Sequence, residues 1–364
     1  MKGCIISQQS LSSRWIEAAM KNYFDSVDSF NLKDIEECLE QGKMTIMHKG
    51  KALERYDCVY IRGSFRYANL LESIAAAIED ECYTPITSRG FTIGHDKILN
   101  MIAFALGKVP IPRSYLFSNV KKAKEFLEKN ANYPIIIKIP NGTQGKGVLY
   151  ADSYASASSV LDTLSALRQP FLVQEYVESG NSDLRVIVAG KKVVAAMMRR
   201  AKIGEKRANI HAGGEGEPVL IDDKTKEVAV KAAKSMGASI CAIDILYGAK
   251  GPVAIEGNLS PGLQGITRAT KIDVADEIAR FLFEESKNFM ENKNGTATSK
   301  LFKELGITPV KANQKTSFVS SLNFKGNNLL IPKEIFKECN FNSDDEFEIF
   351  TDKGYLEIKK LPKD

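Results

Sequence analysis

Three oxygen-bearing side chains lie close together in the segment CAIDILYGAKGPVAIEGNLSPGLQ, residues 241–264. Asp244 lies in one apolar run, and after a Gly-Pro turn a second apolar run carries Glu256 and Asn258. Side chains two apart in a strand point to the same face, so Glu256 and Asn258 can converge with Asp244 of a neighbouring strand. Such ligands suit Mg²⁺, which completes its shell with water and substrate phosphates. The pattern indicates a nucleotide-dependent enzyme, and a hairpin with an acidic face is the alternative.

Two lysines stand where a positive charge is unfavourable unless an anion lies nearby. Lys97 follows Asp96, a typical helix-capping residue, so its cation would oppose the dipole at the start of a predicted helix. Lys138 interrupts the apolar run 135–139, which is typical of a buried strand, and an unpaired buried charge is expensive. Phosphate groups near both lysines would explain these positions, with an ordinary surface lysine as the alternative for Lys97.

A glycine-rich loop comes shortly after Lys138. Its glycines and polar residues include Gly142, Thr143, Gln144, Gly145 and Gly147. The backbone N–H groups of such a loop can close over phosphates, although it lacks the Ser or Thr that follows Gly-Lys in a P-loop. An ordinary hairpin turn would use the same residues, so the loop alone leaves both interpretations open.

Two predicted strands end in residues that can contact a ligand. The run FLVQEY leads into a linker, where backbone groups of Glu175, Tyr176 and Val177 could bind an adenine edge. Arg62 follows the predicted strand 56–61, at the end where open α/β sheets usually present ligand groups. A solvated loop arginine is the alternative for Arg62.

A basic segment lies between these strands and the carboxylates. Residues 181–201 are typical of a β-hairpin, in which Asp183 and Arg185 share one face of the first strand. The remaining polar residues of interest are Arg199, Arg200, Arg207, Asn209 and His211. No metal-ligand spacing surrounds His211, which favours a hydrogen-bonding role over metal binding.

The elements that must position these residues are those of an α/β protein. Before about residue 90, short β-rich runs alternate with helical patterns, which predicts a small domain with a parallel sheet. Residues 222–236 have helical spacing and end at Gly237, directly before the strand that carries Asp244.

The composition of the 364-residue chain is that of a globular protein, with 44% hydrophobic and 26% charged residues. The net charge of +5 permits anionic ligands without requiring a nucleic acid. Six cysteines are scattered without a CxxC pair, which indicates reduced thiols and a cytoplasmic location. No window reaches about 18 uninterrupted apolar residues, so neither a secretion signal nor a membrane span is expected.

An ordered set of motifs runs through the chain: HDK, IIKIPNGTQGKGV, VQEYVE, DLRVIVAGKKVVAAMMRRA, RANIHAGG, AIDIL and IEGNLSPGLQGI. In this order they closely resemble the ATP-grasp ligases of the RimK-like group, over residues 1 to about 285 and most weakly before residue 85. The resemblance implies an α/β (α+β) ATP-grasp fold. Its parts would be a pre-ATP-grasp α/β domain over 1–90 and an ATP-grasp domain over 91–285, with a lid over about 110–175.

The same resemblance implies roles for individual residues. Those implied to bind ATP are Lys97, Lys138, Gly142, Thr143, Gln144, Gly145, Gly147, Glu175, Tyr176, Val177, Asp183, Arg207 and Asn209. Those implied for catalysis are Arg199, Lys138 and Asn258. The implied metal ligands are Asp244, Glu256 and Asn258, which would hold two Mg²⁺ ions, with Mn²⁺ as an alternative.

More detailed contacts follow from this resemblance. The two lysines would hold the ATP phosphates, Asp183 would point toward the ribose, and Arg199 would face the phosphoryl group or acyl intermediate. The chain departs from the family pattern in the longer lead TSRGFTIG before His95, and at Gly257, where the family usually has a bulkier apolar residue. Neither departure falls on an implied ligand position.

Members of this group are ATP-dependent carboxylate–amine ligases that add glutamate to proteins or small molecules. ATP would convert an acceptor carboxylate into an acyl phosphate, from which the amine displaces phosphate. The expected partners are an amino acid, L-glutamate above all, and an acceptor carboxylate on a protein C-terminus, a pterin or a deazaflavin.

The C-terminal part of the sequence is different. Residues 286–316 are polar and predict a linker with one short helix. Residues 317–364 predict a strand, a turn at 326–327, a second strand, a short helix after Pro332 and a final hairpin. This β-rich segment, including IPKEI, resembles an AbrB/SpoVT-type swapped-hairpin domain, which implies a homo-oligomer and, in regulators, DNA binding.

The charge of this tail favours dimerisation over DNA binding. From Lys311 to Asp364, nine lysines balance nine acidic residues, whereas binding to the phosphate backbone needs clustered cations. A nucleotide-sensing DNA-binding regulator is nevertheless the alternative function for the whole chain. The complete set of lysines and metal ligands favours an enzyme.

Overall fold

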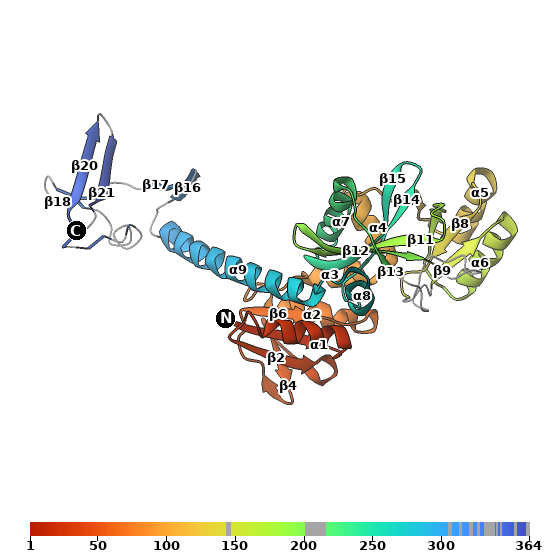
Figure 1. The fold of residues 1–364 in the computed structure, drawn as a ribbon, viewed down its shortest axis with the longest axis horizontal. Coiled ribbons are helices and arrows are strands. Elements are labelled where there is room, and N and C mark those ends of the chain that lie inside the picture. Colours follow the sequence, from red (N-terminus) through yellow and green to blue (C-terminus); the bar gives the residue numbers. More distant parts are fainter. Residues whose placement is uncertain are drawn as a thin grey trace. The chain divides into compact units, whose positions relative to one another are not determined.

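The computed structural model describes residues 1–142, 147–200 and 216–304, with side chains up to residue 293, and shorter stretches between residues 308 and 361. The chain divides into two compact units, Met1–Glu291 and Asn292–Asp364. The first unit combines helices with several small sheets (Figure 1). This mixture agrees with the predicted fold class.

A parallel sheet is formed near the N-terminus, as the alternation of strands and helices predicts. Its order is β2–β1–β6, with β1 (Lys2–Ser7), β2 (Ser26–Asn31) and β6 (Cys58–Ile61). Helix α1 (Leu11–Met20) connects the first two strands, and η2 (Phe65–Tyr67) and α2 (Ala68–Ile78) follow β6. Because the strands are parallel, β1 and β6 end at the same edge of the sheet, and Arg62 lies at that edge.

A small antiparallel sheet, which the sequence patterns do not reveal, is inserted between β2 and β6. The 3-10 turn η1 (Leu32–Asp34) leads into β3 (Ile35–Glu40), β4 (Lys43–His48) and β5 (Lys51–Ala52). Charged residues interrupt the apolar alternation in these strands, because much of this sheet is exposed.

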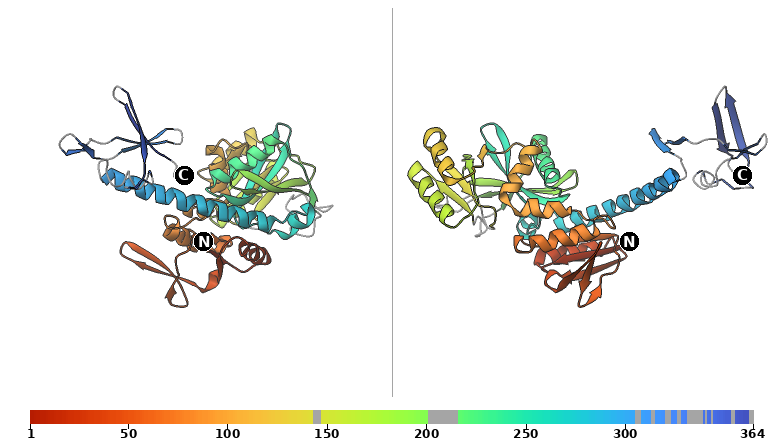
Figure 2. Two further views of the ribbon diagram at one scale, coloured as in Figure 1. Left: turned by 60° about the vertical axis from the view of Figure 1, so that its left-hand side comes forward. Right: turned by 180° about the vertical axis from the view of Figure 1, so that it is seen from behind.

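A five-stranded antiparallel sheet carries the predicted carboxylates, in the order β13–β12–β11–β14–β15. Its strands are β11 (Ser182–Ala189), β12 (Lys192–Arg200), β13 (Gly216–Pro218), β14 (Ile240–Gly248) and β15 (Gly251–Asn258). Helix α7 (Asp223–Ser235) contacts β11, β12, β14 and β15 (Figure 2). Its apolar residues are spaced three and four apart, so one face of the helix is buried: Val228, Ala229, Ala232 and Ala233.

Two consecutive helices lie between the N-terminal sheet and the rest of the chain. The TSRGFTIG lead forms α3 (Ser88–His95), and α4 (Lys97–Leu106) follows it and contacts β15. Asp96 Oδ1 accepts hydrogen bonds from the backbone N–H groups of Ile98 (2.7 Å) and Leu99 (3.0 Å), which confirms the predicted cap.

A four-stranded sheet with two helices has a hydrophobic core of its own, including Leu127, Ile137 and Leu161. Its strands, in the order β7–β10–β8–β9, are β7 (Ser114–Tyr115), β8 (Ile135–Lys138), β9 (Val148–Ala151) and β10 (Leu172–Glu175). The helices are α5 (Val120–Asn130) and α6 (Tyr154–Ala166). These elements occupy the range predicted for the lid.

The structure differs from the prediction after residue 264. Helix α8 (Gln264–Thr270) is followed by α9 (Val274–Glu304), which continues through most of the predicted linker. A polar segment rich in Glu, Lys, Ala and Phe and without proline is compatible with a solvent-exposed helix, which polarity alone does not distinguish from a linker. No helix among the described residues is long and apolar enough to cross a membrane.

The second unit contains three antiparallel hairpins within its described residues. They pair β16 (Thr308–Ala312) with β17 (Lys315–Val319), β18 (Asn323–Lys325) with β19 (Asn328–Leu330), and β20 (Phe347–Asp352) with β21 (Tyr355–Lys360). The last two fall where hairpins are predicted, while the first was not predicted. The helix expected after Pro332 lies outside the described residues, and the AbrB-like character of the tail stays a prediction.

Candidate active site

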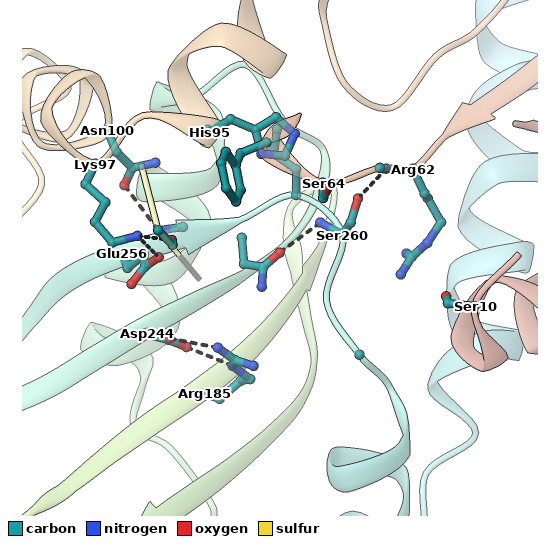
Figure 3. Close-up of a pocket in the computed structure, with 18 of the residues that line it drawn as sticks. Ser10, Arg62, Ser64, His95, Lys97, Asn100, Arg185, Asp244, Glu256 and Ser260 are labelled. Carbon is teal, nitrogen blue, oxygen red and sulfur yellow. Dashed lines mark hydrogen bonds and ion pairs between the residues drawn. The ribbon is translucent and has the colours of Figure 1, made fainter. Parts of the chain in front are cut away.

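A cavity of about 420 Å³ lies where the N-terminal sheet, helices α3 and α4 and the five-stranded sheet meet (Figure 3). Its lining includes the three predicted metal ligands, Asp244, Glu256 and Asn258, together with Lys97 and Arg199. The lining runs from Gln8 to Gly262, so the cavity gathers residues that are far apart in the chain.

The strand register explains how the three oxygen-bearing side chains meet. Strands β14 and β15 are antiparallel neighbours, with Asp244 opposite Glu256 and a register shift directly after Asp244. Asn258 lies two residues beyond Glu256, and its Oδ1 accepts a hydrogen bond from the backbone N–H of Ser260 (3.0 Å). All three residues line the same cavity, while their binding of metal stays a prediction.

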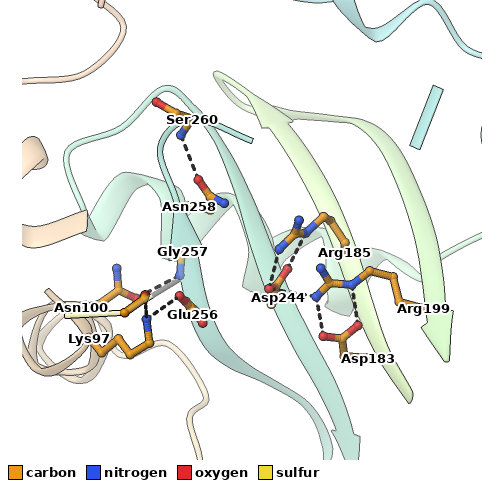
Figure 4. A network of polar contacts seen from close by, with 11 residues as sticks. Lys97, Asn100, Asp183, Arg185, Arg199, Asp244, Glu256, Gly257, Asn258 and Ser260 are labelled. Atoms are coloured by element: carbon orange, nitrogen blue, oxygen red, sulfur yellow. Dashed lines mark hydrogen bonds and ion pairs between the residues drawn. The ribbon is translucent and has the colours of Figure 1, made fainter. Parts of the chain in front are cut away.

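Lys97 is held between a carboxylate and a backbone carbonyl. Its Nζ donates to Glu256 Oε1 (3.0 Å) and to the carbonyl oxygen of Gly142 (2.7 Å) (Figure 4). Its backbone N–H also donates to the carbonyl oxygen of Pro140 (3.0 Å). The anion that offsets the cation at this helix start is therefore Glu256, and Lys97 joins β15 to the start of the glycine-rich loop.

Lys138 lies in β8 and is only 6% exposed. Its Nζ donates to the carbonyl oxygen of Ile255 (3.1 Å), one residue before Glu256. Burial lowers the pKa of Lys138 from its ordinary value to about 8, despite the opposing effect of the Glu256 carboxylate. Lys138 is therefore a buried cation that an anionic ligand would stabilise.

A second cavity, of about 90 Å³, brings the residues predicted for adenine next to Lys138. Glu175, Tyr176 and Val177 line it from the end of β10, together with Lys138 and Glu256. Glu256 lines both cavities, so the two spaces adjoin at this carboxylate.

Two arginines and two aspartates of β11, β12 and β14 form a buried ion network. Arg185 donates to Asp244 through Nε (2.9 Å to Oδ1) and Nη2 (2.8 Å to Oδ2). Arg199 lies 2.9 Å from Asp244 Oδ2 and also pairs with both oxygens of Asp183 (Figure 4). Burial alone would raise the pKa of Asp244, but the two guanidinium groups lower it well below its usual range.

In the structure the partner of Asp183 is Arg199, and the orientation toward the ribose that the family resemblance implies stays a prediction. Asp183 is 1% exposed, both its oxygens accept from Arg199, and it is not among the residues that line the second cavity. Burial and the neighbouring Asp244 raise the pKa of Asp183, against the effect of Arg199. Arg199 lines the larger cavity, but its donors are directed to carboxylates, and its catalytic role stays a prediction.

Several predicted residues lie outside the part of the chain that the structure describes. These are Thr143, Gln144, Gly145, Arg207, Asn209 and His211. At the edges of the glycine-rich loop, Gly142 accepts from Lys97, and Gly147 has a φ of +84°, a conformation that favours glycine.

The sequence patterns did not assign site roles to Asn100 and Arg185, which the structure places in the larger cavity. Asn100 donates from Nδ2 to Met236 Sδ (2.8 Å), and its Oδ1 accepts from the backbone N–H of Gly257 (3.1 Å). A polar residue three positions after Lys97 on an otherwise apolar helix was the available signal.

Packing explains the unusual Gly257 between the predicted ligands Glu256 and Asn258. A Cβ at this position would overlap Sδ and Cε of Met236, which is fully buried. Met236 therefore fills the space that a larger residue 257 would need.

We expect Gly257→Val to lower the free energy of unfolding by about 1–3 kcal/mol, because the added side chain collides with Met236. Met236→Ala should remove the collision, so the double variant should be more stable than the sum of the single changes predicts. Urea unfolding of the four proteins measures this coupling. Additive effects would show that Met236 is not the obstacle.

Comparison with protein families gives an independent assignment. A family model described as a RimK-like ATP-grasp domain matches residues 94–282. The "Probable alpha-L-glutamate ligase" of Thioalkalivibrio sulfidiphilus is 38% identical over 68% of this chain and 83% of that protein. "Probable alpha-L-glutamate ligase 2" of Pseudoalteromonas atlantica is 32% identical over 79% of this chain and 97% of that protein.

Solved structures share the fold. PsnB, an ATP-grasp ligase complexed with its minimal precursor, Mg and ADP, has a TM-score of 0.61 at 19% identity, over 78% of this chain and 97% of that one. A RimK domain protein from Sphaerobacter thermophilus has a TM-score of 0.59 at 15% identity, over 77% of this chain and 99% of that one. These matches confirm the predicted ATP-grasp fold. Together with the family match, they show that the chain belongs to the RimK-like family of ATP-grasp ligases, enzymes that form C–N bonds.

Proposed function

We propose that this protein uses ATP and Mg²⁺ to join the amine of L-glutamate to an acceptor carboxylate, on a protein C-terminus or on a small molecule such as a pterin or deazaflavin. The observation that carries this proposal is that Glu256 lines both cavities. A nucleotide in the smaller cavity would thus direct its phosphates toward Lys97, Lys138 and the oxygen-bearing side chains. The names of the relatives, alpha-L-glutamate ligases, support glutamate as the amine substrate.

The residues present fit Mg²⁺. Asp244, Glu256 and Asn258 supply hard oxygen atoms on adjacent strands, and Mg²⁺ typically uses one or two carboxylates and completes its shell with water and phosphate oxygens. A carboxylate has about four lone-pair sites, so Asp244 can keep its arginine contacts and still bind a cation. We propose that these residues would hold two Mg²⁺ ions, and that Mn²⁺ could replace them because its ligand preference is similar.

The side chains of the site can promote both steps of such a reaction. Lys97 and Lys138 would stabilise negative charge on the transferring phosphoryl group, while the acceptor carboxylate attacks it and ADP leaves. The amine of glutamate then attacks the acyl phosphate, phosphate leaves, and the amine gives up a proton. Mg²⁺, when bound, supplies further neutralisation of phosphate charge. Enclosure of the cavity would protect the acyl phosphate from water.

The test is release of ADP and phosphate by the full-length protein with Mg²⁺, ATP, L-glutamate and a panel of carboxylate acceptors. Equal amounts of ADP, phosphate and glutamylated product are expected with at least one acceptor. ATP binding without product from any acceptor or amino acid would contradict the proposal.

Nucleotide affinity should depend on pH because of Lys138. Below pH of about 8 its ammonium is charged and attracts phosphate; above that pH the unliganded protein must take up a proton to restore the charge. Affinity for Mg²⁺–ADP should therefore fall by up to about tenfold per pH unit above 8. Calorimetric titration across this range measures the effect.

The pH effect has two matched variants. Lys138→Met should bind the nucleotide more weakly and lose the dependence, whereas Lys122→Met, on an exposed lysine paired with Glu125, should keep both properties. An affinity of the unmodified protein that stays constant from about pH 7 to pH 9.5 would show that Lys138 does not contact the phosphates.

A further inference from the structure

One buried cation in the larger cavity is not used by the chemistry described so far. Arg62 follows β6 at the carboxyl end of the parallel sheet and is 3% exposed. Its guanidinium donates to Ser13 Oγ (3.2 Å), the Tyr60 hydroxyl (2.9 Å) and the carbonyl oxygen of Pro261 (2.7 Å). All three acceptors are neutral.

The donors of Arg62 are only partly used. A guanidinium has five N–H groups, and the three hydrogen bonds leave two of them without an acceptor among the described residues. No described carboxylate forms an ion pair with Arg62, whereas the other buried arginines, Arg185 and Arg199, each pair with aspartate. A buried cation without an anion is costly, so this position favours a ligand that carries negative charge.

The groups that contact Arg62 in the described part of the chain are hydroxyl and carbonyl oxygens, with no carboxylate among them. Ser10, Ser13 and Ser64 line the same cavity, and Ser10 caps the N-terminus of α1, where the helix dipole favours an anion. The acidic residues that line this cavity, Asp244 and Glu256, already have cationic partners. Among the described residues no acid is left to pair with Arg62, so the position favours an anion supplied by a bound molecule.

The position of Arg62 identifies which substrate group it can hold. Figure 3 shows Arg62 on the far side of Ser260 from Lys97 and Glu256. The carboxylate that accepts the phosphoryl group must lie at the lysines and metal ligands, and the amine attacks there as well. Arg62 therefore lies away from the reacting carboxylate, on a side of the cavity where another group of one of the two substrates can bind.

We propose that Arg62 binds a substrate carboxylate that is not consumed in the reaction, and that this is a carboxylate of the amino-acid substrate. The inference rests on the proposed function and adds the amino-acid subsite to it. A planar guanidinium with two remaining N–H donors is suited to a carboxylate, and the charge-assisted pair would be shielded from water in this cavity. Contacts of Arg62 with Pro261 and of Gly63 with Ser260 Oγ (3.1 Å) join the subsite to the loop after Asn258.

The test compares Arg62→Gln and Arg62→Lys with Arg66→Gln, an exposed arginine four residues later that does not line the cavity. In the ligase assay, Arg62→Gln should raise the KM for L-glutamate by about 10- to 100-fold, with a smaller change in kcat. The affinity for Mg²⁺–ADP should stay within about twofold, which also shows that the variant is folded. The KM of Arg62→Lys for L-glutamate should lie between those of Arg62→Gln and the unmodified protein. The KM of Arg66→Gln should match that of the unmodified protein.

Substrate analogues identify the group that Arg62 binds. With the unmodified protein, the KM for either glutamine or isoglutamine should exceed the KM for glutamate by about the factor that Arg62→Gln causes with glutamate. Arg62→Gln should have similar KM values for that analogue and for glutamate. A raised KM for the acceptor in place of glutamate would overturn the assignment to the amino acid. Unchanged KM values for both substrates would overturn the subsite.

A binding measurement separates this inference from the proposed function. The full-length protein saturated with Mg²⁺–ADP is titrated with each of the common L-amino acids by calorimetry. If no acceptor supports turnover, weaker binding of the same amino acid to Arg62→Gln than to Arg66→Gln would still support the subsite. Equal binding by the two variants, or no binding of any amino acid to the unmodified protein, would contradict it.

Discussion

Replacement of Glu256 by Gln is expected to lower turnover by at least about 10³-fold while leaving the protein folded. Glu256 lies between the two cavities and pairs with Lys97, so its carboxylate is in place to hold a cation against the phosphates. Gln keeps a carbonyl oxygen that can still accept from Lys97 Nζ, so the free energy of unfolding should change by no more than about 1–2 kcal/mol. Product formation and urea unfolding measure the two effects.

The matched control is Glu54→Gln, which removes the charge of an exposed glutamate that also pairs with a lysine, Lys2. This variant should keep full activity. Raising the Mg²⁺ concentration should recover part of the rate that Glu256→Gln loses, because a weakened metal site fills at a higher concentration. The rate of Glu54→Gln should not change. Activity of Glu256→Gln equal to that of Glu54→Gln would remove Glu256 from the metal site.

Replacement of Arg199 by Met is expected to lower the free energy of unfolding by about 3–5 kcal/mol. Arg199 pairs with Asp183 and Asp244, which are both buried. Loss of its charge leaves Asp183 without its bidentate partner in a region from which water is excluded. Urea unfolding followed by circular dichroism measures the change.

The neighbouring Arg200 provides a control of the same residue type. Arg200 pairs with Glu217 at 3.1 Å, but both side chains are exposed, so Arg200→Met should cost less than about 1 kcal/mol. The double variant Asp183→Leu/Arg199→Met should recover at least about 2 kcal/mol relative to Arg199→Met, because it removes both charges. Similar costs for Arg199→Met and Arg200→Met would show that the network contributes little to stability.

Local patterns in the sequence predicted the elements that carry the site. The apolar runs around Asp244 and Glu256 identify adjacent strands, and the cap at Asp96 identifies the helix that begins with Lys97. The lysine within an apolar strand, Lys138, correctly indicates a buried cation. Each of these charged residues stands at a position where its strand or helix would favour another residue type. Such positions indicate functional residues even when only one sequence is at hand.

The partners of these residues could not be predicted from local patterns. The pairing of Lys97 with Glu256 depends on how α4 packs against β15, and the pairing of Arg199 with Asp183 depends on the register of the β11–β12 hairpin. The family resemblance implies that Asp183 points toward the ribose, which stays a prediction, and it gave no indication that the register places Asp183 directly opposite Arg199. Likewise, the burial of Arg62 follows from the meeting of the N-terminal sheet with the loop after Asn258, which are about 200 residues apart in the chain.

The most direct test of the proposed function is isotope incorporation from labelled L-glutamate. The full-length protein, with ATP and Mg²⁺, is incubated with the protein and small-molecule fractions of cells that lack it, and products are identified by mass spectrometry. We predict labelled product with glutamate joined through an amide to an acceptor carboxylate, formed together with ADP and absent with Glu256→Gln. ATP-dependent labelling by a different amino acid alone, or no labelled product although the protein binds ATP, would contradict the account.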